Sequence, residues 1–202
     1  YTIAALFMLL FSYIFANAIA GLESSNTLMF SFTEVFYDVL FYFIFLLPIL
    51  TMRTFADERK FGTEVLLMTS PVSVAKIVLA KFFANVTVYI FMLAGTALFP
   101  IITAINGEVI VSQLICAYIG IFCWGVMYIS LGMLVSSFTE NSIIAAIIGE
   151  LFMFVVLFLD DFSNTAFISQ FPKLQSVIYA FAAQPRFAYF SQGFIRLSDL
   201  VF

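Results

Sequence analysis

The chain has 202 residues, of which 64% are hydrophobic and 10% are charged, and its formal net charge is −4. Ordinary globular domains carry roughly 25% charged residues, and a soluble fold of this size cannot bury so much apolar surface. The composition therefore excludes a soluble domain and predicts an all-α membrane protein that crosses the bilayer several times.

Five apolar segments are long enough to cross a bilayer, which takes about 20 residues with a range of about 17 to 25. In chain order these segments are residues 1–20, 35–52, 74–102, 110–134 and 143–159. The sequence has no internal repeat and no Gly/Ser linker, so we expect one transmembrane domain over the whole chain. We expect a sixth span to begin near Ser198 and to be missing from this chain.

The loop between the second and third spans, residues 53–73, carries most of the basic charge. Five basic residues lie in it or just after it: Arg53, Arg59, Lys60, Lys76 and Lys81. Basic loops mark the cytoplasmic side, so we predict that this loop is cytoplasmic and that the protein lies in the cell membrane. The loops at 21–34 and 103–109 then face outward, and neither contains Lys or Arg.

Within this loop the sequence predicts one short helix over about residues 54–68. Acids precede bases in DERK, residues 57–60, which suits the helix dipole if the acids lie in the first turn. Phe61, Val65 and Met68 recur at helical spacing and form an apolar stripe. We therefore expect an elbow helix that lies along the membrane surface.

The tail after the fifth span also shows helical periodicity. Apolar residues recur three and four apart after Pro172, and aromatic residues do so after Pro185. Over about residues 172–194 we therefore predict amphipathic helices that rest on the outer membrane interface.

The loop sequence resembles a known family. The string MRTFADERKFGTE at 52–64, continuing to Lys81, is similar to the elbow of type-2 ABC transporter permeases, and of their gliding-motility branch in particular. Two departures are Asp57, where the family usually has Glu, and Ala80, where a Gly usually precedes the Lys. Residues 191–200 are more weakly similar to the segment that precedes the sixth span in this family.

The resemblance implies a six-span half-transporter that pairs with a second permease, identical or different, and with a separate ATP-binding cassette subunit. ATP and Mg are then expected on that subunit, and we expect no cofactor or metal in this chain. Membrane lipids and an accessory outer-face subunit are further expected partners, and nucleic acid is not. The residues expected to contact the ATPase are Arg53, Phe55, Asp57, Glu58, Arg59, Lys60, Phe61, Gly62, Thr63 and Glu64.

Polar residues inside the spans are costly in lipid and are candidates for a substrate path or a permease interface. Glu150 lies seven residues into the fifth span, where it either lines the path, couples protons, or packs against a partner beside Gly149. Asp38 lies about one turn from the outer end of the second span, where water is within reach. Asn85 either faces the path or forms an interhelical hydrogen bond.

Taken together, these features predict the permease subunit of an ABC exporter. The chain has no G-x-x-x-x-G-K-[ST] loop, so it is not expected to be an enzyme or to hydrolyse ATP itself. The absence of histidine also removes most zinc, haem and Ser-His-Asp chemistry. The alternative is an ATP-independent secondary transporter or channel, which typically relies on intramembrane ionisable relays or inverted repeats.

Overall fold

The computed structural model describes residues 2–25, 32–106 and 110–164, and after them only Phe171, Gln175, Ile178, Tyr179, Phe187 and Phe190. Every regular element assigned in the described ranges is a helix. The elements are α1 (Thr2–Ser25), α2 (Phe32–Thr51), α3 (Arg53–Lys60), α4 (Glu64–Met68), α5 (Val74–Thr96), α6 (Leu98–Asn106), α7 (Val111–Phe138) and α8 (Ser142–Ser163).

Within the described residues, five apolar helical segments are long enough to span a membrane, which confirms the predicted number. The predicted third span, 74–102, consists of two helices that join at Ala97, where the Ala97 N–H donates to Ala94 O at 3.2 Å. The outer-face helices predicted over 172–194 and the start of a sixth span lie almost wholly outside the described residues. The membrane protein is thus an all-α, multi-pass bundle.

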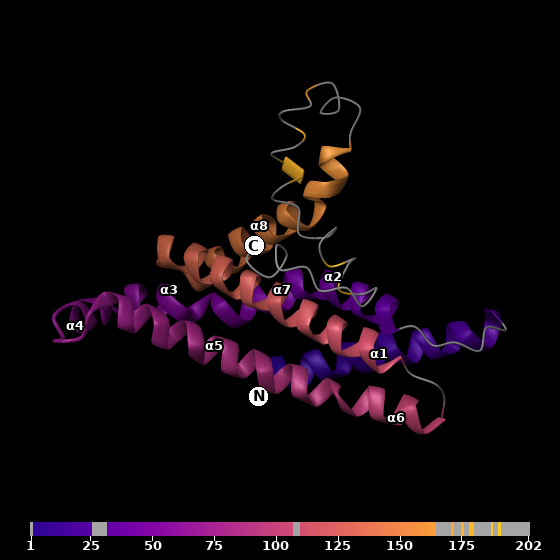
Figure 1. Cartoon of the computed structure of the whole chain (residues 1–202). Coiled ribbons are helices and arrows are strands. Elements are labelled where there is room, and N and C mark those ends of the chain that lie inside the picture. Colours follow the sequence, from indigo (N-terminus) through magenta and orange to yellow (C-terminus); the bar gives the residue numbers. More distant parts are fainter. Residues whose placement is uncertain are drawn as a thin grey trace.

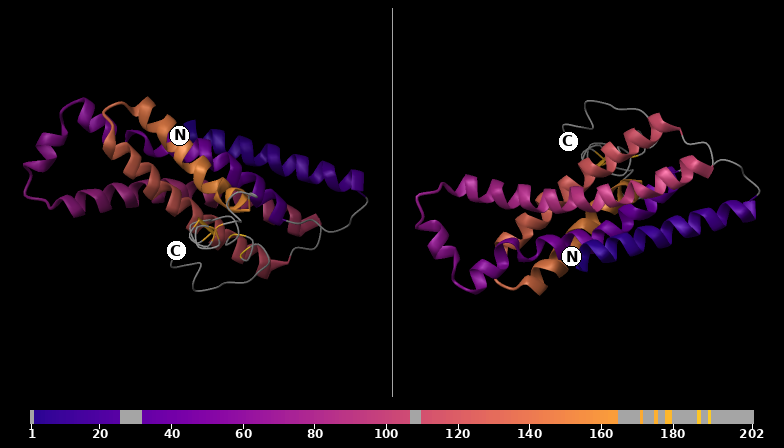
Figure 2. Two further views of the ribbon diagram at one scale, coloured as in Figure 1. Left: turned by 90° about the horizontal axis from the view of Figure 1, so that it is seen from above. Right: turned by 90° about the horizontal axis from the view of Figure 1, so that it is seen from below.

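The long helices run side by side, and α2 and α7 occupy the middle of the bundle (Figure 1, Figure 2). α2 packs against α1, α7 and α8, and α7 packs also against α5. One face of α2 is almost wholly buried, from Val35 to Leu47, whereas α5 and α8 expose many large apolar side chains. Such exposed faces are suited to lipid.

Aromatic rings from several helices interlock in the core. Phe7 of α1 stacks on Phe43 of α2 with ring centroids 5.8 Å apart, and Phe11 packs on Phe99 of α6 at 5.0 Å. Edge-to-face and offset contacts of this kind add to the dispersion energy of the packed core. The abundant phenylalanine is therefore used for packing as well as for lipid contact.

Two glycines let neighbouring helices approach α7 closely. A Cβ at Gly125 would overlap the phenol ring of Tyr89 of α5, whose hydroxyl donates to Ile121 O at 2.6 Å. A Cβ at Gly132 would overlap the hydroxyl of Thr51, the last residue of α2. Small residues of this kind let membrane helices pack backbone to backbone.

The end of α2 leads almost directly into α3. Pro48 lies inside α2 and lacks the N–H that would bond one turn back, which favours a bend there. Met52 alone separates the two helices, and its N–H donates to Pro48 O at 2.7 Å. The charged segment is consequently a continuation of the second span, positioned by that span.

Candidate functional site

The charged segment α3–α4 lies at one end of the bundle, on the left in Figure 1. At the same end α5 and α8 begin and α2 and α7 end. α3 packs against both α7 and α8. The structure therefore gathers the residues from 53 to 64 where the ends of several spans meet.

The prediction of one helix over 54–68 is wrong. α3 ends at Lys60, and α4 begins only at Glu64. Gly62 between them has a φ of +70°, the left-handed conformation in which glycine commonly ends a helix. An added Cβ at Gly62 would meet open space within this chain, so the left-handed conformation explains the glycine in this structure.

The expected position of the acids is also wrong. The first turn of α3, which begins at Arg53, contains no acidic residue, whereas Arg59 and Lys60 do lie in its last turn. Only the basic half of the pattern complements the helix dipole.

Polar contacts close the break between α3 and α4. The Arg59 Nε donates to Glu64 Oε2 at 3.1 Å, and the Thr63 hydroxyl donates to Glu58 O at 3.2 Å. A pair this accessible to water contributes little to stability. These contacts fix the angle of the elbow more than they stabilise the fold.

α5 contacts α3 through Lys81 and Asn85, which lie one turn apart on α5. The Lys81 Nζ donates to Thr54 O at 2.6 Å and forms an ion pair with Glu58. It also lies 4.5 Å from the centre of the Phe55 ring. The Asn85 Nδ2 donates to the Thr54 hydroxyl at 3.1 Å, so the structure places Asn85 in this junction as an interhelical hydrogen-bonding residue.

α7 and α8 hold α3 from another side. Ser136 is 1% exposed, and its hydroxyl accepts the N–H groups of Phe55 and Ala56 at 3.1 and 3.2 Å and donates to Met52 O at 2.9 Å. The first residue of α8, Ser142, donates its hydroxyl hydrogen to Asp57 Oδ1 at 2.5 Å. Ser136 thus supplies partners for the backbone groups at the start of α3, which no residue of α3 caps.

Apart from Arg59 and Glu64, which pair with each other, the expected ATPase contacts divide into two groups. Phe55, Asp57 and Glu58 face α5, α7 or α8 and hold the segment in place. The residues that are exposed to solvent are Arg53, Lys60, Phe61, Gly62 and Thr63. An external protein can reach the second group without displacing α3.

The elbow presents an apolar face. Phe61, Val65, Leu66 and Met68 are 57–72% exposed. Behind this face lies a cavity of about 630 Å³ between α3, α4, α5 and α7, with Glu58, Arg59 and Glu64 at its polar rim. Exposed apolar patches of this kind mark contact with a membrane or with another protein.

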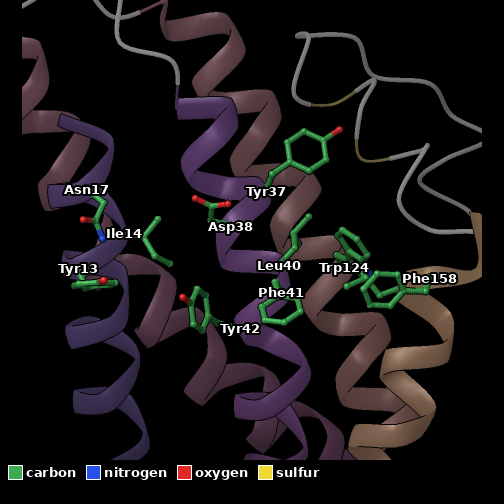
Figure 3. Close-up of a pocket in the computed structure, with 11 residues that line it drawn as sticks. Tyr13, Ile14, Asn17, Tyr37, Asp38, Leu40, Phe41, Tyr42, Trp124 and Phe158 are labelled. Atoms are coloured by element: carbon green, nitrogen blue, oxygen red, sulfur yellow. The ribbon is translucent and has the colours of Figure 1, made fainter. Parts of the chain in front are cut away.

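The three candidates for a substrate path do not meet. Asn85 belongs to the elbow, as described above. Asp38 lines a second cavity, of about 500 Å³, in the opposite half of the bundle (Figure 3). Glu150 is half-buried on α8 and lines neither cavity, and its neighbour Gly149 packs against Pro48.

Several residues of this site escaped the sequence analysis. Ser136 and Ser142 are ordinary serines near the ends of spans, and nothing in the sequence relates them to a loop more than 80 residues away. Lys81 was noted as a basic residue and as part of the resembling string, but not as a partner of α3. In the described part of the chain, no three Cys, Asp or Glu side chains gather in a way that could hold a metal ion.

Comparison with protein families matches residues 1–156 to the family described as ABC-2 family transporter protein. The match covers most of the chain, including all of the elbow. The chain belongs to the ABC-2 transporter family. Comparisons with curated proteins and with solved structures found no match.

Membership identifies this all-α, multi-pass chain as an ABC transporter permease. ABC-2 permeases are membrane transport subunits that pair with an ATP-binding subunit, which settles the general kind of partner. The elbow of this permease, held by α5, α7 and α8, is the most extensively bonded polar region in the described structure.

Proposed function

We propose that this permease is half of an ABC exporter and that α3–α4 is the coupling segment through which a separate ATPase moves the spans. The observation that carries the proposal is the anchoring of α3. Its backbone or side chains bond to Lys81 of α5, Ser136 of α7 and Ser142 of α8. A force applied to the elbow would therefore reach four spans at once, including α2, from which α3 continues.

The exposed surface of the elbow suits a protein contact. Phe61 is 71% exposed beside the cationic Lys60, whose Nζ lies 5.8 Å from the ring centre. Aromatic side chains such as Phe are enriched at protein interfaces relative to the rest of the surface. On this proposal Arg53, Lys60, Phe61, Gly62 and Thr63 touch the ATPase, and Phe55, Asp57, Glu58, Arg59 and Glu64 position them.

The remaining expectations enter the same proposal. The elbow lies on the cytoplasmic side of the cell membrane, because the basic residues gather in this loop. ATP and Mg bind the partner subunit, and a second permease, identical or different, completes the path. Export, the gliding-motility branch and an accessory outer-face subunit rest on the resemblance of residues 52–81. Transport then proceeds by alternating access, with the two permeases rocking as the ATPase closes.

The experiment is purification of the tagged chain from its own membranes under mild conditions, with the partners identified by mass spectrometry. We expect an ATP-binding cassette subunit in stoichiometric amount. Phe61→Ala removes the exposed ring of the elbow and should lower recovery of that subunit about tenfold, the effect of a contact of about 1.4 kcal/mol.

Ile105→Ala is the matched control. Ile105 is 77% exposed near the end of α6, away from the elbow, and its truncation should leave the recovered ATPase unchanged. Wild-type chain recovered without any ATP-binding subunit contradicts the coupling proposal as a whole. Equal recovery with both variants would instead exclude Phe61 from the contact.

A further inference from the structure

The second cavity, in the half of the bundle opposite the elbow, has a chemical character of its own. It has a volume of about 500 Å³ and lies where α1, α2, α7 and α8 approach one another. Six residues give it this character: Tyr13, Asn17, Asp38, Phe41, Tyr42 and Trp124. Cavities that bind small organic molecules have volumes of about 300–1,000 Å³. This one is large enough for an organic molecule of moderate size.

Polar groups on two facing helices occur in register. Tyr13 and Asn17 are four residues apart on α1, and Asp38 and Tyr42 are four apart on α2, so each pair shares one helix face. α1 and α2 run antiparallel, and Figure 3 shows Asn17 and Asp38 at one level with Tyr13 and Tyr42 further along. The two helices together present a carboxylate, an amide and two phenols to one space.

Asp38 is the only charged residue in the cavity lining, and it has no partner among the described residues. No hydrogen bond or ion pair to its carboxylate occurs in the described structure, and the nearby lining contains no Lys or Arg. It lies six residues after the start of α2, about 9 Å along the helix at 1.5 Å per residue. Its side chain is exposed, and it lies only three residues after Val35, where the apolar span begins, so water can reach it. A cation that enters the cavity therefore meets an accessible carboxylate with no partner in the described part of the chain.

The aromatic walls indicate what kind of cation fits. Tyr13 and Tyr42 lie on the side of α2 to which the carboxylate points, one level further along the helices, and Phe41, Trp124 and Phe158 line the other side. Aromatic rings near an anionic group attract organic cations by cation–π contact. A Ca²⁺ or Mg²⁺ ion would need about six oxygen ligands, which one carboxylate and one amide do not supply.

We propose that this cavity binds a monovalent organic cation with an apolar body, with Asp38 as the counter-ion and the surrounding rings as the apolar walls. Tyr13 is 59% exposed and Phe41 41% exposed, so the cavity opens sideways toward lipid. A cationic amphiphile reaches it from the membrane. That this molecule is the transported substrate rests on the proposed export function, whereas its binding does not.

The test uses the full chain in phosphatidylcholine nanodiscs, without ATP or ATPase, and radiolabelled tetraphenylphosphonium as the probe. Saturable binding, above that of empty discs, is the expected result. Asp38→Asn should weaken it at least about tenfold, because the variant keeps the shape of the side chain but removes its charge. Tetraphenylborate, of the same shape and opposite charge, should show no saturable binding to the wild type.

Asp161→Asn is the matched control, an exposed acid on α8 outside the cavity, and should bind the probe like the wild type. Tyr42→Leu tests the aromatic wall independently and should weaken binding if Asp38→Asn fails to fold. Equal binding to wild type and both cavity variants overturns the proposal.

The two proposals fail separately. If the chain binds the probe through Asp38 but recruits no ATP-binding subunit, the cation site is supported and the export function is contradicted. If the chain recruits the ATPase but the wild type and Asp38→Asn bind the probe equally well, the coupling proposal is supported and the cation site is contradicted.

Discussion

Replacing Ser136 with alanine removes the side chain that joins α7 to the start of α3. Its hydroxyl accepts two backbone N–H groups, from Phe55 and Ala56, and donates to Met52 O. The hydroxyl is almost completely buried, with the residue 1% exposed. The substitution thus leaves three backbone groups without this partner and removes only one oxygen from the packed volume.

A buried hydrogen bond contributes about 1 kcal/mol net, so the loss of three lowers the free energy of unfolding by about 3 kcal/mol. The free energy is measured by reversible unfolding in mixed micelles, with circular dichroism as the signal. Backbone amide exchange supplies a local readout, and Phe55 and Ala56 should exchange faster than in the wild type.

Ser137→Ala is the matched control on the next residue. The Ser137 hydroxyl bonds only within its own helix, to Leu134 O at 2.6 Å, and this substitution should cost less than about 1 kcal/mol. If Ser136→Ala and Ser137→Ala destabilise equally, or if the exchange of Phe55 and Ala56 is unchanged, Ser136 does not anchor the elbow.

Three further predictions concern the elbow and the helix packing. Gly62→Ala places a Cβ at a φ of +70° and should cost about 1–2 kcal/mol in unfolding experiments, since no L-residue adopts that angle freely. Lys81→Met should slow ATP hydrolysis by the assembled transporter several-fold, whereas Lys76→Met, at an exposed position in the first turn of α5, should not. Gly132→Ala should destabilise the bundle by about 2–3 kcal/mol. Adding Thr51→Ala to this variant should recover part of the lost stability, because it removes the overlapping hydroxyl.

The spans could be predicted from the sequence because apolar length is a local property. The second span is α2, which runs from Phe32 to Thr51 where 35–52 was expected. The fifth span is α8, which runs from Ser142 to Ser163 where 143–159 was expected. Helix α5 begins directly after Ser73, which is extended as a capping position requires. Differences of a few residues at helix ends are expected, because end residues lack partners within the helix.

The elbow was predicted as a segment but not in its form. A charged stretch with an apolar stripe indicates a surface helix, yet the break at Gly62 depends on one residue whose left-handed conformation the periodicity does not reveal. The anchors of α3 could not be predicted either. Ser136 and Ser142 reach it across more than 80 residues, and only the packing of α7 and α8 on α3 brings them together.

The polar residues inside the spans could also be predicted only in part from the sequence. The sequence identified Asp38 as a polar residue near the outer end of a span, and the i, i+4 pairs of α1 and α2 could have been found by the same search. Their register across the two helices could not, because it depends on the loop between them. Asn85 was correctly weighed as a hydrogen-bonding residue, but its partner Thr54 is determined by how α3 lies on α5.

Site-specific photo-cross-linking in intact cells tests the central claim most directly. A photoreactive amino acid at position 61, on the exposed face of the elbow, should cross-link to an ATP-binding cassette subunit. The same amino acid at position 105, at the far end of the bundle, should not. A cross-link to the ATPase from position 105 and none from position 61 would contradict the assignment of α3–α4 as the coupling segment.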